Sequence, residues 1–232
     1  MQTILVTGAS RGLGFYFVKR YLETGNRVFA GVRAEQSEGL AALREQFGDA
    51  LTIVRLDVGS TASAEEAAKA VTAQTDRLDL VINNAAIHGE TSFLELEKTD
   101  LEECLPVYNS NAVGPLRVAK AFLPLLRKGH AARIINISSE SGSIGMAKRV
   151  KEFDYCMSKA ALNMATKLLS NDLKNDGISL LAVQPGWMRT DMGGANADLD
   201  PYETACKLVK LFAQLPAEGP LFVDHDGAEL PW

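Results

Sequence analysis

The 232-residue chain has few of the residues that cross-link a small fold or hold a metal ion. It contains three cysteines and three histidines. Cys104, Cys156 and Cys206 are odd in number and widely spaced, and the sequence has neither a Cys-x-x-Cys pair nor histidines at metal-ligand spacing. This pattern disfavours a disulfide framework and a structural metal site. It predicts a reduced, cytoplasmic protein without a bound metal.

Long apolar runs and an excess of positive charge are also lacking. No run approaches the roughly 18 apolar residues of a membrane span. The chain enters a strand-like segment at once, without the basic region and apolar stretch of a signal peptide. The net charge is −5, and the basic cluster 148–151 is interpreted as a solvated loop. We therefore expect no nucleic-acid partner and no membrane partner.

The composition is ordinary for a globular protein, with 47% hydrophobic and 23% charged residues. A chain of this length can bury a substantial core, and it shows no repeat or linker, so residues 1–232 are interpreted as one domain. The predicted strands are Thr3–Thr7, Arg27–Val32, Leu51–Leu56, Leu78–Ile82, Arg133–Ile137, Ile178–Gln184 and Leu221–Val223. The predicted helices are Gly14–Thr24, Gly39–Phe47, Ser63–Gln74, Leu101–Lys128, Tyr155–Lys174 and Tyr202–Leu215.

The alternation of apolar strands with helices indicates the fold class. Near-continuous apolar strands are typical of a parallel sheet that is covered on both faces. With right-handed crossovers, this order predicts an α/β doubly wound Rossmann fold with a seven-stranded parallel sheet flanked by helices. Ligands of such sheets bind beyond the carboxyl ends of the strands. The polar motifs of this chain fall at those ends.

The most informative motif is the glycine-rich turn Thr7–Gly14 between the first predicted strand and helix. Glycine lets the backbone turn tightly and approach a diphosphate without a Cβ in the way. The helix N-terminus adds backbone N–H groups and the positive end of the helix dipole. The spacing Gly-x-x-x-Gly-x-Gly is one residue wider than the common dinucleotide fingerprint. A turn of this kind without any ligand remains the alternative.

The end of the second strand bears on the choice between NADP(H) and NAD(H). A carboxylate here commonly holds the ribose hydroxyls of NAD, but this chain has Val32 followed by Arg33. Together with Arg11 in the glycine turn, Arg33 favours the 2′-phosphate of NADP(H) through charge-assisted hydrogen bonds. Glu35 is close enough in sequence to keep NAD(H) as an alternative.

Further polar or small residues follow the third and fourth strands. Asp57, which precedes Val58, can accept a hydrogen bond from an adenine amino group. Asn83-Asn84-Ala85-Ala86 combines side-chain amides with small residues that permit close approach of a cofactor. The same four residues could equally form a tight turn with no ligand.

The candidate catalytic pair is Tyr155 and Lys159. Residues four apart share one face of a helix, so the phenol and the ammonium can meet the same ligand. A nearby cation favours the phenolate, and we expect the pKa of Tyr155 to fall below its usual value of about 10. Such a tyrosine can exchange a proton with an alcohol or carbonyl oxygen near neutral pH. The pair alone also arises by chance.

Two more polar residues complete this candidate site. Ser139, with Ser138 as the fallback, ends the fifth strand and can donate a hydrogen bond to the same substrate oxygen. Asn111 lies inside a helical pattern although asparagine is a poor helix former. We expect it to hold a water molecule that links Lys159 to solvent.

In this order, the motifs resemble those of the short-chain dehydrogenase/reductase superfamily, in its shorter single-domain branch. The likeness runs over nearly the whole chain and rests on the glycine turn, Asn83–Ala86, Asn111, Ser139, Tyr155, Lys159, Pro185, Gly186 and Thr190. One departure is Asn-Asn-Ala-Ala where the family has Asn-Asn-Ala-Gly. The length, the start 3–7 and the ending Asp226–Trp232 are most similar to C-factor-like carbonyl reductases.

The resemblance implies a catalytic tetrad and a hydride-transfer activity. The tetrad would be Asn111, Ser139, Tyr155 and Lys159, and the reaction would be reversible reduction of an aldehyde or ketone to an alcohol. Tyr155 would act as general acid and base, Ser139 would polarise the carbonyl, and Lys159 would contact the nicotinamide ribose. The expected cofactor-binding residues are Gly8, Ser10, Arg11, Gly12, Leu13, Gly14, Arg33, Asp57, Val58, Asn84, Ala85, Tyr155, Lys159, Pro185, Gly186 and Thr190, with Thr190 on the carboxamide.

Other functions remain as alternatives. One is an NADP-binding regulatory or signalling protein with little turnover. An epimerase or dehydratase of the extended branch is disfavoured, because 232 residues leave no room for its longer substrate region. A homo-oligomer formed through the helices that hold Asn111 and Tyr155 is a further expectation of the resemblance. His88, Met146 and Trp187 follow strand ends, where they line the substrate pocket or pack within loops.

Overall fold

The computed structural model describes residues 1–34, 37–214, 216, 218–219 and 221–232. The strands are β1 (Thr3–Thr7), β2 (Arg27–Val32), β3 (Leu51–Arg55), β4 (Leu80–Asn83), β5 (Arg133–Ile137), β6 (Ser179–Val183) and β7 (Phe222–Val223). The α-helices are α1 (Gly12–Glu23), α2 (Glu38–Phe47), α3 (Thr61–Thr72), α4 (Cys104–Tyr108), α5 (Gly114–Leu126), α6 (Phe153–Asp172) and α7 (Pro201–Gln214). Short helical turns are η1 (Gly48–Ala50), η2 (Leu96–Lys98), η3 (Leu101–Glu103), η4 (Asn109–Val113), η5 (Glu140–Gly142) and η6 (Lys174–Asp176).

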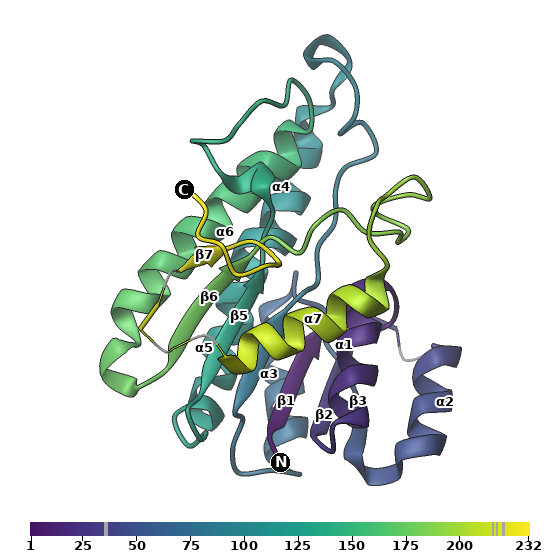
Figure 1. Cartoon of the computed structure of the whole chain (residues 1–232), viewed down its shortest axis with the longest axis vertical. Helices are drawn as coiled ribbons and strands as arrows, with labels where there is room; N and C mark the ends of the chain where they lie inside the picture. The colour runs from purple at the N-terminus through teal and green to yellow at the C-terminus, as the bar shows by residue number, and fades with distance from the viewer. Residues whose placement is uncertain (35–36, 215, 217, 220) are drawn as a thin grey trace.

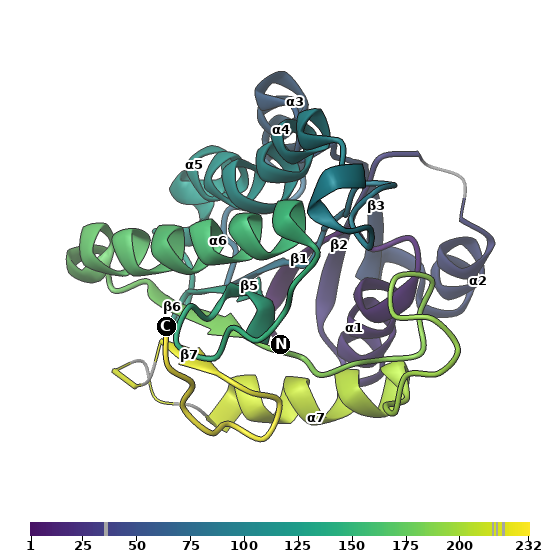
Figure 2. The same cartoon turned by 90° about the horizontal axis from the view of Figure 1, so that it is seen from above.

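The strands of the described residues form one seven-stranded sheet in the order β3-β2-β1-β4-β5-β6-β7, and every neighbouring pair is parallel (Figure 1). Helices α1, α2 and α7 lie on one face, and α3, α4, α5 and α6 lie on the other (Figure 2). The predicted Rossmann fold is therefore confirmed. The strand order reverses between β1 and β4, and the crevice at such a switch point is where ligands of these sheets bind.

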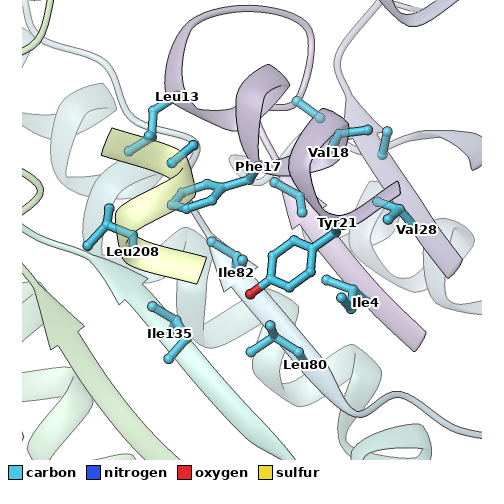
Figure 3. Packing of buried hydrophobic residues seen from close by; sticks show 14 of the residues in the cluster. Ile4, Leu13, Phe17, Val18, Tyr21, Val28, Leu80, Ile82, Ile135 and Leu208 are labelled. Atoms are coloured by element: carbon cyan, nitrogen blue, oxygen red, sulfur yellow. The ribbon is translucent and has the colours of Figure 1, made fainter. Parts of the chain in front are cut away.

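A separate hydrophobic cluster fills each side of the sheet. On one side, Phe17 and Tyr21 of α1 pack with Leu208 of α7 over β1 and β4 (Figure 3). On the other side, Phe122 of α5 packs over the same strands. Because the central strands are buried from both faces, they read as continuous apolar runs rather than as alternating ones: β1 is buried at all five positions, whereas the edge strand β3 ends on the exposed Arg55.

The prediction of one uninterrupted helix over Leu101–Lys128 is wrong. The segment remains helical, but a π turn (η4) separates α4 from α5. Pro115 has no N–H to donate to the carbonyl of Asn111 four residues earlier, so the α-helical hydrogen-bond ladder breaks here. The other predicted boundaries shift by one or two residues, and Leu215 lies outside the described residues.

The described residues contain neither a membrane-spanning helix nor a metal-binding cluster, and their thiols are unpaired. Within them, no helix combines the length and the apolar character needed to cross a bilayer. No group of three or more His, Cys, Asp and Glu side chains in this part of the chain is arranged to hold a metal ion. The thiols of Cys104, Cys156 and Cys206 are free.

Replacing Phe17 with alanine tests the packing between α1 and α7. Phe17 is fully buried, and its ring centroid lies 5.9 Å from that of Phe212. We expect Phe17→Ala to lower the free energy of unfolding in urea by about 3–5 kcal/mol, through lost burial and the cavity left behind. The matched control Phe93→Ala, at a site 52% exposed, should cost less than about 1 kcal/mol. Equal losses in the two variants would contradict this packing.

Candidate active site

The glycine turn packs directly against the residues that follow β4. Gly8 and Gly12 have positive φ angles of 64° and 55°, which favour glycine. A Cβ on Gly8 would lie 2.8 Å from the Cα of Ala85. A Cβ on Gly14 would lie 2.3 Å from the carbonyl oxygen of Gly8. The turn therefore needs glycine at both positions in order to pack this closely against itself and against the segment after β4.

Side-chain hydrogen bonds hold the ends of β1 and β4 together. Asn84 Nδ2 donates to the carbonyl oxygens of Thr7 at 3.1 Å and Gly8 at 3.2 Å. Thr7 Oγ1 accepts hydrogen bonds from the backbone N–H groups of Asn84 and Ala85 at 3.0 and 3.1 Å. The segment after β4 is thus more than a local turn, and the structure brings Gly8, Asn84 and Ala85 together.

Leu13 and Ser10 are two further residues of this turn that are expected to bind the cofactor. Leu13 is buried in the hydrophobic cluster beside α1, so its backbone N–H rather than its side chain is available to a ligand. Ser10 is exposed, and its carbonyl oxygen accepts a hydrogen bond from Ser37 Oγ at 3.0 Å.

The ends of β2 and β3 form the outer part of the candidate cofactor site. Arg33 is exposed immediately after β2, and Glu35 lies outside the described residues. Asp57 is exposed, and its Oδ1 accepts the backbone N–H of Gly59 at 2.9 Å. Val58 is buried against α5, where a Cβ on Gly114 would lie 3.1 Å from the Val58 Cβ.

The guanidinium of Arg11 has a partner that the sequence did not suggest. It forms an ion pair with the carboxylate of Asp191, which follows Thr190, and the two side chains are 71% and 70% exposed. An exposed pair of this kind is weak, at about 0–1 kcal/mol. Arg11 therefore stays available to a bound phosphate.

The segment after β6 returns to the glycine turn. The methyl carbon of Thr190 lies 3.5 Å from the position of a Cβ on Gly12. Gly186 has a φ of 88°, and a Cβ there would lie 2.3 Å from Leu199 Cδ1. Pro185 is buried directly before it. The structure thus places Thr190 beside the turn that would hold the diphosphate.

Lys159 is buried between α6 and the end of β5. Its side chain is 2% exposed, and Nζ donates a hydrogen bond to the carbonyl oxygen of Ile137 at 2.7 Å. Burial disfavours the charged ammonium and lowers the pKa of Lys159 to about 7. Nζ also lies 5.4 Å from the centroid of the Tyr155 ring.

The prediction that Lys159 lowers the pKa of Tyr155 is wrong for this structure. Burial raises the pKa of Tyr155 well above its usual value, and the carboxylates of Glu140 and Glu152 raise it further. The ammonium donates to the Ile137 carbonyl and lies near the ring instead of bonding the hydroxyl. At neutral pH the Tyr155 phenol is therefore protonated, and in this structure it is a weaker acid than a free tyrosine.

The two serines after β5 have different surroundings. Ser138 is buried, and its hydroxyl donates to Asn163 Oδ1 at 2.6 Å. Ser139 is half-buried, and its hydroxyl is near enough to Tyr155 to lower the pKa of the phenol, against the larger effect of burial. Ser139 also donates to Glu140 Oε2 at 2.6 Å. Of the pair, Ser139 is the serine that faces the phenol.

The side chain of Asn111 is fully engaged in holding neighbouring segments. Its Nδ2 donates to the carbonyl of Ile87 at 2.8 Å and to Ser158 Oγ at 3.0 Å. Its Oδ1 accepts the backbone N–H of Ile87 at 2.9 Å. Both N–H groups of the amide are taken, so the expected water contact would fall to the main-chain carbonyl that Pro115 leaves without its α-helical donor.

Sequence reasoning missed the charged residues around this site. Arg149, interpreted as part of a solvated loop, forms ion pairs with Glu140, the residue after Ser139, and with Glu152, three residues before Tyr155. Asp154 is buried and accepts hydrogen bonds from Gly89 N–H at 2.7 Å and Ser92 Oγ at 2.6 Å. The spacing of Arg149 and Glu152 was a local signal that could have predicted their ion pair, whereas the partners of Asp154 are more than 60 residues away and are brought to it only by the fold.

Comparison with known proteins gives consistent matches over most of the chain. The family model described as short chain dehydrogenase matches residues 2–199. The short chain dehydrogenase gsfK of Penicillium aethiopicum is 37% identical over 253 aligned residues, which cover 99% of each chain. The C-signal protein of Myxococcus xanthus is 36% identical over 159 residues, which cover 68% of this chain and 95% of that protein.

A solved structure extends the likeness to three dimensions. The NADPH-bound carbonyl reductase from chicken fatty liver superposes with a TM-score of 0.91 at 33% identity, covering 100% of this chain and 99% of that one.

The buried ammonium predicts a pH dependence of stability. Between pH 7 and 10.5 the unfolded chain binds a proton at Lys159 that the native protein lacks, so the free energy of unfolding should rise with pH over this window. We expect the difference in urea unfolding free energy between wild type and Lys159→Met to rise from pH 7 to 9.5 and to stay flat below pH 6. A difference that is constant from pH 6 to 9.5 would show that Lys159 is not buried as described.

Proposed function

The chain belongs to the short chain dehydrogenase family, and from that premise we propose that it is an NADP(H)-dependent oxidoreductase that reversibly reduces an aldehyde or ketone to an alcohol. The observation that carries this proposal is the position of buried Lys159, whose Nζ lies 5.4 Å from the centroid of the Tyr155 ring, with Ser139 near enough to influence the same phenol. A protein that only binds a nucleotide has no physical need for this group. The NADPH-bound carbonyl reductase from chicken supports both the reaction class and the cofactor.

The residues at the carboxyl edge of the sheet fit a dinucleotide. The glycine turn precedes the N-terminus of α1 without side chains at Gly8, Gly12 and Gly14, and Thr190 lies against it. We expect Gly8, Gly12 and Gly14 to admit the diphosphate beside the N-terminus of α1. When bound, NADPH supplies the hydride. Asp57 would accept a hydrogen bond from the adenine amino group.

The proposed chemistry assigns one task to each polar group. Tyr155 is protonated at neutral pH and would give its proton to the carbonyl oxygen of the substrate. Ser139 would donate a hydrogen bond to the same oxygen and hold it in place. Lys159 would contact the nicotinamide ribose, and Asn111 would complete the proton path through its main-chain carbonyl. We further propose that residues 1–232 form a single domain and that the protein acts in the cytoplasm.

A regulatory protein with little turnover is the second candidate. The similarity to the C-signal protein of Myxococcus xanthus favours it. The two candidates differ in a simple measurement, because a nucleotide sensor binds NADPH without consuming it. The tetrad positions are all filled in this chain, so we place the oxidoreductase first.

The acid assignment is tested by Tyr155→Phe, which removes one hydroxyl and keeps the ring. We expect NADPH to bind within about twofold of wild type, while the rate of carbonyl reduction falls by at least ~10²-fold, the usual size of general acid catalysis. Tyr108→Phe, at an exposed position of α4, is the matched control and should keep full activity. A Tyr155→Phe enzyme that retains most of its rate would refute the assignment.

The preference for NADP(H) is tested by Arg33→Ala. Loss of a charge-assisted hydrogen bond to the 2′-phosphate should weaken NADPH binding by about 10- to 100-fold and leave NADH affinity nearly unchanged. Isothermal titration of both nucleotides measures this. The control Arg44→Ala removes an exposed arginine of α2 and should change neither affinity. Equal weakening of NADPH and NADH by Arg33→Ala would rule out a 2′-phosphate contact.

A further inference from the structure

The sequence ending Asp226–Trp232 folds back on the sheet through a tight turn. Asp224 Oδ1 accepts the backbone N–H groups of Asp226 at 2.8 Å and Ala228 at 2.9 Å. Gly227 has a φ of 88°, and a Cβ there would lie 2.8 Å from Leu211 Cδ1. The turn therefore needs its glycine, and it reverses the chain direction directly after β7.

After the turn, the chain runs back alongside β7. Val223 pairs antiparallel with Glu229, and the Leu230 N–H donates to the carbonyl of Phe222 at 2.9 Å. The Trp232 ring stacks on the buried Phe222 ring, with 5.5 Å between centroids and 22° between planes. An aromatic stack of this kind fixes the end of the segment in place. We call residues 222–232 the foldback.

The foldback presents two main-chain carbonyls to the loop between β5 and α6. Ser143, which is buried, donates its hydroxyl to the carbonyl of Pro231 at 2.6 Å. The Gly145 N–H donates to the carbonyl of Trp232 at 2.9 Å. Figure 2 shows the C-terminal end of the described chain beside this loop. These two hydrogen bonds join residues 143–146, here called the wall segment, to the foldback.

The wall segment begins four residues after Ser139, on the same loop as the candidate catalytic site. The intervening turn η5 packs closely on α6, because a Cβ on Gly142 would lie 2.7 Å from the backbone of Lys159. Within the wall segment, Ile144 is 81% and Met146 is 39% exposed. Large apolar side chains held this far into solvent, beside a reactive centre, provide a surface for an apolar ligand.

We propose that the foldback positions Ile144 and Met146 as an apolar wall for the carbonyl substrate, with Trp232 and Pro231 acting as positioning residues. This inference rests on the proposed function and deepens it, because it assigns the site a substrate with a large apolar group, such as an aryl ring, beside its carbonyl. The foldback lies on β7 at one edge of the sheet, whereas the glycine turn and Arg33 lie at β1 and β2. Loss of the foldback contacts should therefore weaken substrate binding and leave NADPH binding unchanged.

The test compares Trp232→Ala with Trp232→Phe in the full-length chain. Trp232→Ala removes the ring that stacks on Phe222, and Trp232→Phe keeps an aromatic ring there. For Trp232→Ala we expect the KM for 4-nitrobenzaldehyde to rise about tenfold, equivalent to about 1.4 kcal/mol. The KM for propanal and the Kd for NADPH should stay within about twofold, and Trp232→Phe should restore most of the loss. Leu168→Ala, at a position of α6 that is 59% exposed, is the control for a surface truncation.

Hydrogen exchange gives a readout that does not depend on turnover. The Gly145 amide should lose protection in Trp232→Ala and regain it in Trp232→Phe, while amides of β1 are unchanged. Ser143→Ala removes the bond to Pro231 from the other side and should raise the KM for 4-nitrobenzaldehyde in the same way. Because both variants release the same segment, their effects should not add in the double variant.

The outcomes separate the inference from the function on which it rests. If the wild type reduces neither aldehyde, the proposed function fails, and hydrogen exchange still decides whether the foldback holds the wall segment. If the wild type is active and both the KM values and Gly145 protection are unchanged in Trp232→Ala, the inference is overturned. A parallel loss of NADPH affinity and of activity on both aldehydes would also overturn it, because that pattern indicates general destabilisation.

Discussion

The architecture of the candidate site depends on the close contact between the glycine turn after β1 and the segment after β4. Asn84 and Thr7 join these two strand ends by reciprocal side-chain hydrogen bonds. Gly14 leaves no room for a Cβ at the same place. The contact occurs where the strand order reverses, so it fixes the cofactor half of the site against the catalytic half.

Buried polar pairs give the catalytic half its geometry. Asn83 Nδ2 donates to Asn136 Oδ1, and Asn136 Nδ2 donates to Thr166 Oγ1, both at 2.8 Å. These bonds tie β4 to β5 and β5 to α6, the helix that carries Tyr155 and Lys159. Polar groups in a low-dielectric interior are costly when unpaired, so such a network favours one arrangement over others. The buried Lys159 has a polar partner as well, because its Nζ donates a hydrogen bond to the carbonyl oxygen of Ile137.

The sequence was sufficient to predict what local patterns encode. Apolar runs predicted the sheet, and glycine spacing predicted a tight turn between β1 and α1. The strand ends pointed to Asn84 and Ser139, and the helical spacing to Lys159 pointed to Tyr155. It was insufficient where an environment made by distant segments decides the outcome. Burial, with Glu140 and Glu152, reverses the expected pKa shift of Tyr155. The π turn at Asn111 depends on a missing N–H at Pro115, which a periodicity argument passes over. The partner of Arg11 is 180 residues away in the sequence, where spacing gives no guide.

Transfer of a hydride to a substrate carbonyl beside Tyr155 is tested most directly by isotope labelling. The protein is incubated with an aryl aldehyde and NADPH deuterated at both C4 positions, and the alcohol product is examined by mass spectrometry and NMR. We expect one deuterium on the carbinol carbon and none elsewhere. Tight NADPH binding with no labelled alcohol from any aldehyde, ketone or quinone tried would contradict it and favour the regulatory protein.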